Sequence, residues 1–352
     1  MYADSFYPTI DEDDYTIIMI KLRKFFFRKG YDEGFYDGQP KILAACEDWN
    51  NIIPYEQGDG LIWPLPQTRQ MHMEYSLMGG TKHRKGIFAC GVSYRPEPHG
   101  PKLGRHHRQF PLFEWETWGG IEVHDQIIDE LLLDLGFKPK EFFPAEMPCT
   151  FGRQIAHGTG YITETSALKY AFPRVDFKEV VEYYKIEQPS KGTHDIGHQE
   201  EEFLERDLGT CVITGFTKES DPFFNMGRDV STGKYYKRDA IIGGKETIGS
   251  AAREVDPLVI YKNFFKSGKG EFYRTLYRHF GEERVQEEFM HYITLFYNDV
   301  PIDELQEKIE DAKWKELKPY LKPMRERERC GGGIGMTRLI QAAKDKKLMQ
   351  KW

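Results

Sequence analysis

The sequence predicts an α+β fold in which a mainly antiparallel β-sheet is flanked by helices. Segments with a helical spacing of apolar residues alternate with short extended segments, in the order helix, strands, helix, mixed region, strands, helices. Neighbouring extended segments are joined by polar, glycine-rich connections, which is typical of antiparallel pairs. These two observations favour the α+β class.

The first half of the chain supplies two helices and several strands. Residues 15–30 have apolar side chains at helical spacing and end at a glycine, so a helix is expected there. A short extended run over 34–43 follows, in which Pro40 prevents helix continuation. Three more segments are typical of strands, and an amphipathic helix closed by Gly136 completes this half; the strand segments are 53–65, 85–97 and 108–117, and the helix is 124–137.

The second half repeats this mixture after a region that is harder to interpret. Residues 239–254 predict a strand, a tight turn and a second strand, and helices are expected across 270–325. Residues 330–347 are interpreted as a glycine-rich turn that leads into a helix. We therefore expect one catalytic domain in two halves, 1–144 and 216–352, with an insertion or peripheral lobe at 145–215 between them.

Composition excludes several classes of protein. A net charge of −7 argues against indiscriminate binding to nucleic-acid backbone. The five cysteines form no CxxC pair, which favours reduced thiols in a cytoplasmic protein over disulfides or a zinc site. No apolar run is long enough to span a membrane, and the acidic N-terminus is unlike a signal peptide. A cytoplasmic protein with no membrane partner is expected.

The segment from Arg95 to Glu116 has the composition of a nucleotide site. Strand alternation can bring Arg95, Glu97, Phe110, Glu114 and Glu116 to one face. An arginine can bind phosphate through two nitrogens, a carboxylate can accept from an exocyclic amine, and a phenyl ring can stack on a base. The alternative is a solvated hairpin with cross-strand ion pairs, which alternating charges also predict.

Two further segments carry chemistry-bearing residues. In the glycine run from Gly331 the backbone can approach a ligand closely, and Arg338 follows in the first helical turn. Asp239 and Glu246 are carboxylates on neighbouring extended segments, which suits Mg²⁺ bound to triphosphate oxygens, and Arg253 could pair with a substrate carboxylate. Taken singly, the glycine run is also explained by a structural turn, and the charged residues are better explained as ordinary surface charges.

In this order the segments resemble the motifs of class II aminoacyl-tRNA synthetases. The resemblance is closest to the asparaginyl/aspartyl branch, which includes the ammonia-dependent asparagine synthetase. RPE followed by RHHRQFPLFEWE resembles motif 2, ETIGSAARE resembles the metal-binding strand, and GGGIGMTRL resembles motif 3. GFYDGQPKI is similar to motif 1, and LPQTRQMHMEYSLMGG is similar to the substrate-binding segment. The resemblance implies ATP and Mg²⁺ as cofactors, an antiparallel catalytic sheet, and an aminoacyl adenylate as product with release of pyrophosphate.

The resemblance implies that arginine side chains bind the phosphates of ATP. By this resemblance Arg95 would neutralise the α-phosphate while the substrate carboxylate attacks it in line. Arg338 would hold the γ-phosphate, with Arg105 or His106 helping from the motif 2 loop. No side-chain nucleophile is required, because catalysis consists of positioning and charge stabilisation.

The adenine and the metal would contact other residues of the same motifs. The resemblance implies that Glu97 reads the adenine amine and that Phe110 stacks on the ring opposite Arg338. The motif 3 glycines Gly333 and Gly335 are expected to bring backbone close to the nucleotide. Asp239 and Glu246 would anchor Mg²⁺.

The amino acid would bind beside the phosphates. By resemblance Glu47 and Gln70 would hold its α-amino group and carboxylate, while Glu114 and Arg253 would face its side chain. Glu74 is expected to bind the substrate as well, and Glu74 and Glu114 are more similar to the asparaginyl pattern than to the aspartyl one. A glutamate beside the side chain would repel aspartate unless Arg253 offsets its charge, whereas it would accept a hydrogen bond from an amide. The substrate is therefore expected to be aspartate or asparagine.

The acceptor of the activated amino acid stays open between ammonia and tRNA. About 14 residues precede the first helix, and no segment resembles the family's anticodon-binding barrel, so no anticodon-binding domain is expected. That organisation favours tRNA-independent asparagine synthesis from aspartate and ammonia. The alternatives are a compact asparaginyl-type tRNA ligase and a non-catalytic regulatory paralogue that binds an amino acid. The motif 1 resemblance around Pro40 implies a homodimer.

Overall fold

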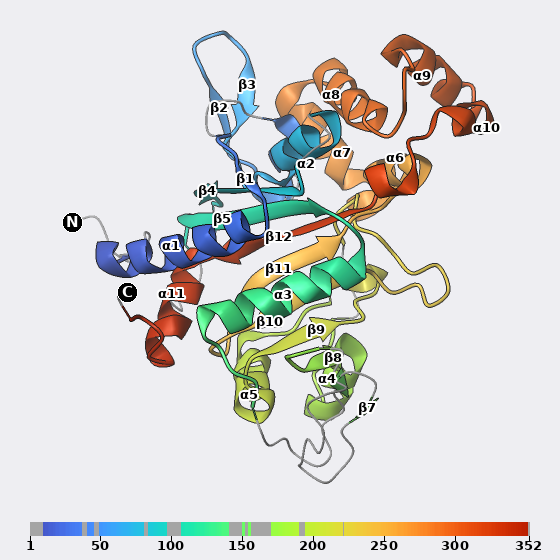
Figure 1. Ribbon diagram of the computed structural model, residues 1–352. Helices are drawn as coiled ribbons and strands as arrows, with labels where there is room; N and C mark the ends of the chain where they lie inside the picture. Colours follow the sequence, from blue (N-terminus) through green and yellow to red (C-terminus); the bar gives the residue numbers. More distant parts are fainter. Residues whose placement is uncertain are drawn as a thin grey trace.

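A single sheet with helices on both faces forms the centre of the molecule in a computed structural model of the chain (Figure 1). The structure describes residues 10–36, 41–45, 49–80, 84–96, 107–140, 150–151, 154–155, 170–189, 194–220 and 222–350. Within these residues, no helix is both long enough and apolar enough to cross a membrane.

The sheet has ten strands in the order β1-β4-β5-β12-β11-β10-β9-β8-β6-β7. All neighbouring pairs are antiparallel except β1 with β4 and β8 with β9. The bounds along the sheet are β1 Asp32–Glu33, β4 Gly86–Tyr94, β5 Gln109–Trp118, β12 Arg329–Gly335, β11 Glu246–Ala252, β10 Lys237–Ile241, β9 Cys211–Thr214, β8 Arg174–Asp176, β6 Thr150–Phe151 and β7 Gln154–Ile155. The predicted α+β fold with a mainly antiparallel sheet is confirmed.

The glycine run at 331–333 is a central strand, so its interpretation as a turn was wrong. β12 pairs with β5 on one side and with β11 on the other. A Cβ at Gly331 would overlap the Trp115 carbonyl and the Glu116 carboxylate, and a Cβ at Gly332 would overlap the Ser250 side chain. Glycine is required here because the neighbouring strands and their side chains approach the backbone of β12 closely.

Substituting Gly331 with alanine is expected to lower the free energy of unfolding by about 1–3 kcal/mol, because the new methyl group overpacks the sheet. Urea denaturation measures the change. Gly333→Ala is the matched control, since its Cβ would lie 3.4 Å from the nearest atom, an ordinary contact. Equal unfolding midpoints for the two variants would contradict this account of the strand.

One face of the sheet is covered by α1 (Glu12–Arg28), α3 (Ile121–Leu135) and α11 (Met336–Asp345). Alternate residues of β5 face these helices, so Phe113 and Trp115 are fully buried in the main hydrophobic core. The two predicted helices, 15–30 and 124–137, correspond to α1 and α3. Gly136 caps α3 in the left-handed conformation with φ 98°, as expected.

The other face carries α2 (Gln70–Gly79) and, at one end, a helical group with its own core. The members of this group are α6 Pro257–Lys266, α7 Glu271–Phe280, α8 Glu282–Thr294, α9 Ile302–Glu310 and α10 Trp314–Leu317. Two details differ from expectation: residues 53–65 form a small hairpin, β2 (Pro54–Glu56) with β3 (Ile62–Pro64), and Ile42–Ala45 is a 3-10 turn. Pro40 lies outside the described residues.

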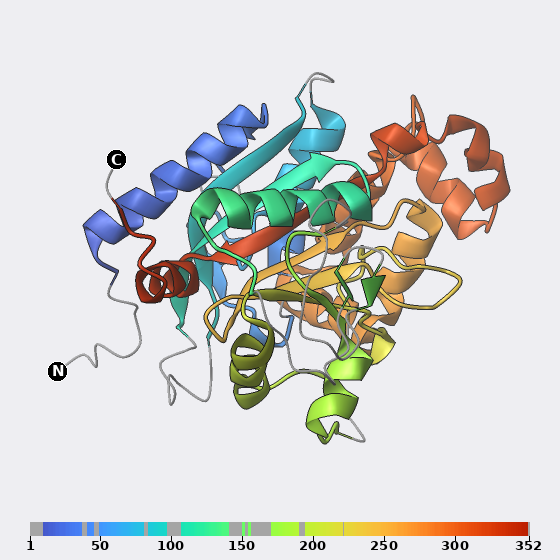
Figure 2. The same cartoon turned by 60° about the horizontal axis from the view of Figure 1, so that its bottom comes forward.

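At the opposite edge of the sheet, α4 (Phe177–Tyr184) and α5 (His198–Leu208) pack on β8 and β9 (Figure 2). They enclose a third hydrophobic cluster that includes Val175, Leu204 and Phe216. We call this part of the chain, residues 170–220 as far as they are described, the peripheral lobe. It corresponds to the second part of the predicted 145–215 insertion and shares the sheet with the rest of the chain.

Candidate functional site

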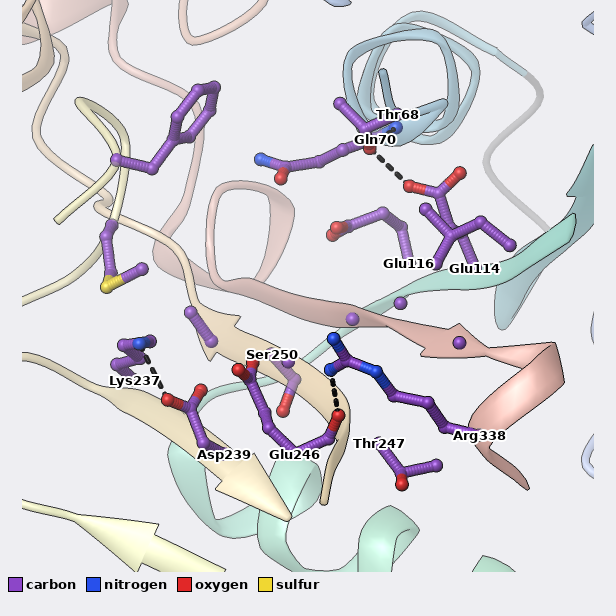
Figure 3. A pocket seen from close by; sticks show the side chains of 18 of the residues that line it. Thr68, Gln70, Glu114, Glu116, Lys237, Asp239, Glu246, Thr247, Ser250 and Arg338 are labelled. Atoms are coloured by element: carbon purple, nitrogen blue, oxygen red, sulfur yellow. Dashed lines mark hydrogen bonds and ion pairs between the residues drawn. The ribbon is translucent and has the colours of Figure 1, made fainter. Parts of the chain in front are cut away.

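A cavity of about 400 Å³ lies on the sheet face opposite α1, α3 and α11. Figure 3 shows side chains that line it. On β5, Leu112, Glu114 and Glu116 line it, while Phe113 and Trp115 between them point to the core. Strand alternation therefore separates a polar face, which forms the cavity, from an apolar face that packs on helices. A cavity of this size is typical of small-molecule sites.

Most of the site residues predicted from the sequence line this one cavity. They are Gln70, Arg95, Phe110, Glu114, Asp239, Glu246, Arg253, Gly333, Gly335 and Arg338. Glu47, Glu97, Arg105 and His106 lie outside the described residues. Glu74 is described but does not line the cavity. The structure thus brings together segments that are more than a hundred residues apart, although their proposed roles remain predictions.

Small residues on β11 and β12 keep the floor of the cavity open. Gly249, Ala251 and Gly333 lie there, on neighbouring strands. β11 also contains a bulge: Ala240 pairs with Ile248, but the next residue of β10 pairs with Glu246. Regular alternation would place Glu246 on the same face as the buried Ile248, so the extra residue lets Glu246 reach the cavity.

Three guanidinium groups line the cavity, and each has a different contact partner. The Arg95 guanidinium lies 5.5 Å from the centre of the Phe110 ring. Arg338, in the first turn of α11, donates to the backbone carbonyl of Glu246. Arg253 donates to the carboxylate of Glu116, and both side chains are almost fully buried. Arg95 and Arg338 are half-buried at the cavity wall, whereas Arg253 is buried against a carboxylate.

Glu114 is tied to the start of α2. One of its carboxylate oxygens accepts from the Thr68 hydroxyl, and the other accepts from the Arg69 backbone N–H at 2.8 Å. The Arg69 guanidinium is 3.9 Å from the same carboxylate and balances its charge. Glu114 lines the cavity, as predicted, and it also orients the segment that carries Gln70.

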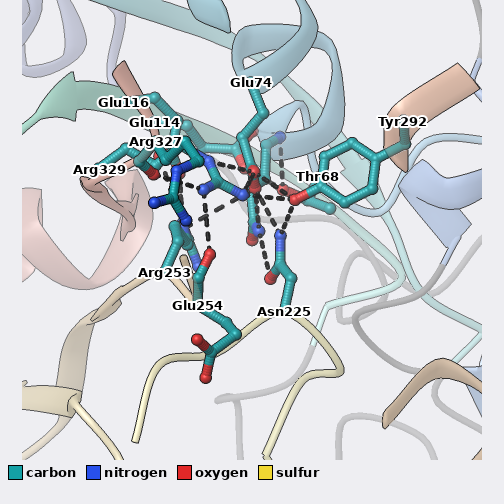
Figure 4. A network of polar contacts seen from close by, with 11 residues as sticks. Thr68, Glu74, Glu114, Glu116, Asn225, Arg253, Glu254, Tyr292, Arg327 and Arg329 are labelled. Atoms are coloured by element: carbon teal, nitrogen blue, oxygen red, sulfur yellow. Dashed lines mark hydrogen bonds and ion pairs between the residues drawn. The ribbon is translucent and has the colours of Figure 1, made fainter. Parts of the chain in front are cut away.

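Glu74 lies behind the cavity at the centre of a buried polar network (Figure 4). Arg329 Nε donates to it at 2.7 Å, and the Tyr292 hydroxyl donates at 2.7 Å. Asn225 donates at 2.8 Å. Burial disfavours the ionised form, but the Arg329 and Arg253 guanidinium groups hold the pKa of Glu74 below its usual value. The resemblance implied that Glu74 binds the substrate, whereas in the structure Glu74 is fully buried and does not line the cavity.

The network fixes how Gln70 faces the cavity. The Gln70 amide nitrogen donates to Glu74 at 2.8 Å and to Asn225 Oδ1 at 3.2 Å. An ionised carboxylate can only accept, so the amide nitrogen must point to Glu74. Both amide hydrogens are then used, and the carbonyl oxygen of Gln70 remains as an acceptor for a ligand.

Asp239 and Glu246 form an acidic corner with Lys237. Lys237 Nζ is 2.6 Å from Asp239 Oδ2, while Asp239 Oδ1 is buried without a hydrogen-bond partner. Burial raises the pKa of Asp239 to about 8; Lys237 opposes this rise and Glu246 adds to it. A bound cation would satisfy the orphaned oxygen. Within the described residues no three metal-ligating side chains converge, so an ion here would take these two carboxylates and complete its shell from phosphate or water.

Sequence reasoning left out several residues of this site. Lys237 is two residues before Asp239 on the same strand, so strand alternation alone could have placed it beside the carboxylate. Glu116 was recognised on the face of β5, but its pairing with Arg253 was not. Thr68 and His107 line the cavity from connecting segments, where no periodic signal exists.

Comparison with known proteins shows a consistent likeness. The family model described as tRNA synthetases class II (D, K and N) matches residues 51–303. An asparaginyl-tRNA synthetase from Pyrococcus horikoshii, complexed with asparaginyl-adenylate, is similar with TM-score 0.60 and 17% identity, over 96% of this chain and 65% of that one. An asparaginyl-tRNA synthetase from Entamoeba histolytica, also with asparaginyl-adenylate, gives TM-score 0.56 and 13% identity over 96% and 64%.

An aspartyl-tRNA synthetase from Entamoeba histolytica gives TM-score 0.54 and 13% identity over 96% of this chain and 60% of that one. At these identities the structural matches show the fold alone. The chain thus spans less than two thirds of the length of these three proteins. The curated protein sequences give no match.

Proposed function

The chain belongs to the class II tRNA synthetases of the D, K and N type, and from this membership we propose that it activates an amino acid with ATP. The substrate carboxylate attacks the α-phosphorus, the bond to the β,γ-phosphates breaks, and pyrophosphate leaves. The observation that carries the proposal is the single cavity lined by Arg95, Arg253 and Arg338 together with Asp239 and Glu246.

The nucleotide end of the cavity supports this reaction through charge and shape. Arg95 supplies positive charge for the α-phosphate, where negative charge develops in the transition state. Arg338 and Phe110 line the cavity together with glycines of β12. In this proposal the two side chains hold the adenine and the γ-phosphate, and the glycines leave room for the nucleotide. Asp239 and Glu246 would hold Mg²⁺, which would supply positive charge to the phosphate oxygens.

The amino-acid end supports a small polar substrate. The free carbonyl oxygen of Gln70 suits an α-ammonium group, which is a donor. Arg253 lines the cavity while it donates to Glu116, so much of its charge is already balanced. We infer that the side-chain subsite is close to neutral, which fits the amide of asparagine and accepts aspartate only if Arg253 turns from Glu116.

Two acceptors follow from the two amino acids. With aspartate, attack of ammonia on the adenylate would give asparagine without tRNA, which is the reaction that the expected domain organisation favoured. With asparagine, transfer to the tRNA terminus would be the next step, and the balanced Glu116–Arg253 pair favours this alternative. In either case the enzyme is an ATP-dependent ligase, and a homodimer is part of the proposal.

Exchange of pyrophosphate into ATP, measured with each amino acid in turn, is expected to respond only to aspartate or asparagine. Aspartate-dependent exchange, with AMP release stimulated by ammonium, supports asparagine synthesis. Asparagine-dependent exchange followed by stable acylation of tRNA supports the tRNA ligase. No exchange with any amino acid would contradict the proposed activation and leave a binding role.

A further inference from the structure

Lys237 extends from β10 into the corner of the cavity where the metal carboxylates lie, and sequence reasoning assigned it no role. Its ammonium is 2.6 Å from Asp239 Oδ2, and its side chain is only 24% exposed. The same ammonium lies 4.2 Å from the centre of the Phe216 ring, in the core of the peripheral lobe. It is thus fixed between a carboxylate and an aromatic face, and it lines the cavity.

The charges around Lys237 keep it cationic. A lysine ammonium is charged near neutral pH unless it is buried without a partner. Here the Asp239 carboxylate, 2.6 Å from Lys237 Nζ, is that partner. A permanent positive charge therefore occupies the acidic corner whether or not a metal ion is bound.

We propose that Lys237 is a resident cation of the phosphate subsite: it holds Asp239 through Oδ2, leaves Oδ1 to a divalent ion, and contributes its charge to the phosphate chain of ATP. This inference rests on the proposed function and assigns a further binding and positioning residue to the same site. The peripheral lobe takes part in the site because the Phe216 ring lies against the lysine ammonium.

The Lys237 ammonium is expected to have opposite effects on two binding events, that of a divalent ion alone and that of the metal–nucleotide complex. Before ATP binds, the ammonium repels a divalent ion on the neighbouring oxygen, so the free protein binds metal weakly. When ATP binds, its phosphates bring negative charge, and both cations then attract it. Removing the ammonium should therefore strengthen binding of the metal alone and weaken binding of the metal–nucleotide complex.

The test compares wild-type protein with Lys237→Met, which keeps the apolar stem and removes the charge. Free Mn²⁺, counted by electron paramagnetic resonance without nucleotide, is expected to bind on the order of tenfold more tightly to the variant. MgATP, titrated by calorimetry, is expected to bind on the order of tenfold more weakly. A side chain with a merely structural role would not move the two affinities in opposite directions.

Two further variants keep the comparison decisive. Lys218→Met removes a lysine that is 81% exposed on the same lobe and should change neither affinity. Lys237→Arg keeps the charge and should keep Mn²⁺ affinity near that of the wild type, which also guards against misfolding of the methionine variant. Unchanged affinities in Lys237→Met, or a parallel loss of both, overturn the inference while wild-type MgATP binding stands. Wild-type protein that binds no MgATP would refute the proposed function, and this inference with it.

Discussion

Replacing Arg329 with methionine is expected to lower the free energy of unfolding by about 3–5 kcal/mol, the typical cost of leaving a buried ion without its partner. Arg329 and Glu74 are both fully buried, and their side chains are hydrogen-bonded at 2.7 Å. Methionine keeps much of the volume but leaves the Glu74 carboxylate with Arg253, 3.9 Å away, as its nearest guanidinium. Urea denaturation followed by circular dichroism measures the loss.

Arg325→Met provides the matched control, because that arginine is four residues earlier and its side chain is 84% exposed. It should unfold within about 0.5 kcal/mol of the wild type. The double variant Glu74→Leu with Arg329→Met should cost less than the two single changes added together, since it removes both buried charges at once. Equal midpoints for the Arg325 and Arg329 variants would show that the buried network is not a source of stability.

Arg338→Ala is expected to reduce the rate of ATP–pyrophosphate exchange by about 10²–10³-fold, as loss of a preorganised charge-stabilising group does. The guanidinium is in the first turn of α11, half-buried, and faces the cavity. Its hydrogen bond goes to a backbone carbonyl, so the fold should remain intact. Exchange assays at saturating amino acid, with urea midpoints recorded in parallel, separate activity from stability.

Arg278→Ala serves as the control for Arg338, because its side chain on α7 is 66% exposed and remote from the cavity. It should retain wild-type exchange. Normal exchange in Arg338→Ala would remove this arginine from the proposed triphosphate site. A collapse of the urea midpoint would instead show that Arg338 supports the fold, contrary to its observed contacts.

The layout of the sheet could be predicted because local patterns determine it. The apolar spacing in 124–137 and its closing glycine gave α3, and alternation in 108–117 gave β5 with its polar face. The carboxylate pair on residues 239–254 was recognised because a hairpin places its two strands side by side. Patterns within a few residues of each other therefore identified most of the cavity.

Features that depend on distant contacts escaped prediction. The glycines of β12 have no periodicity of their own, and their strand geometry comes from the close approach of β5 and β11. Arg329 lies in a charged run typical of a solvated surface, yet Glu74, 255 positions earlier, takes it into the core. No local signal distinguishes such a buried arginine from an exposed one.

The bulge at Glu246 makes the position of this carboxylate a property of backbone register and not of side-chain choice. Straightening β11 without removing a residue, so that Thr247 instead of Glu246 pairs with Ile241, would preserve every acidic residue of the cavity, yet it would turn Glu246 to the face of the buried Ile248 and into the apolar core. Excising Thr247 would have the opposite result, because Glu246 would become the direct neighbour of Ile248 and strand alternation would keep its carboxylate on the cavity face. A sequence that keeps both acids therefore keeps the acidic corner only if the pairing of β10 with β11 is kept as well.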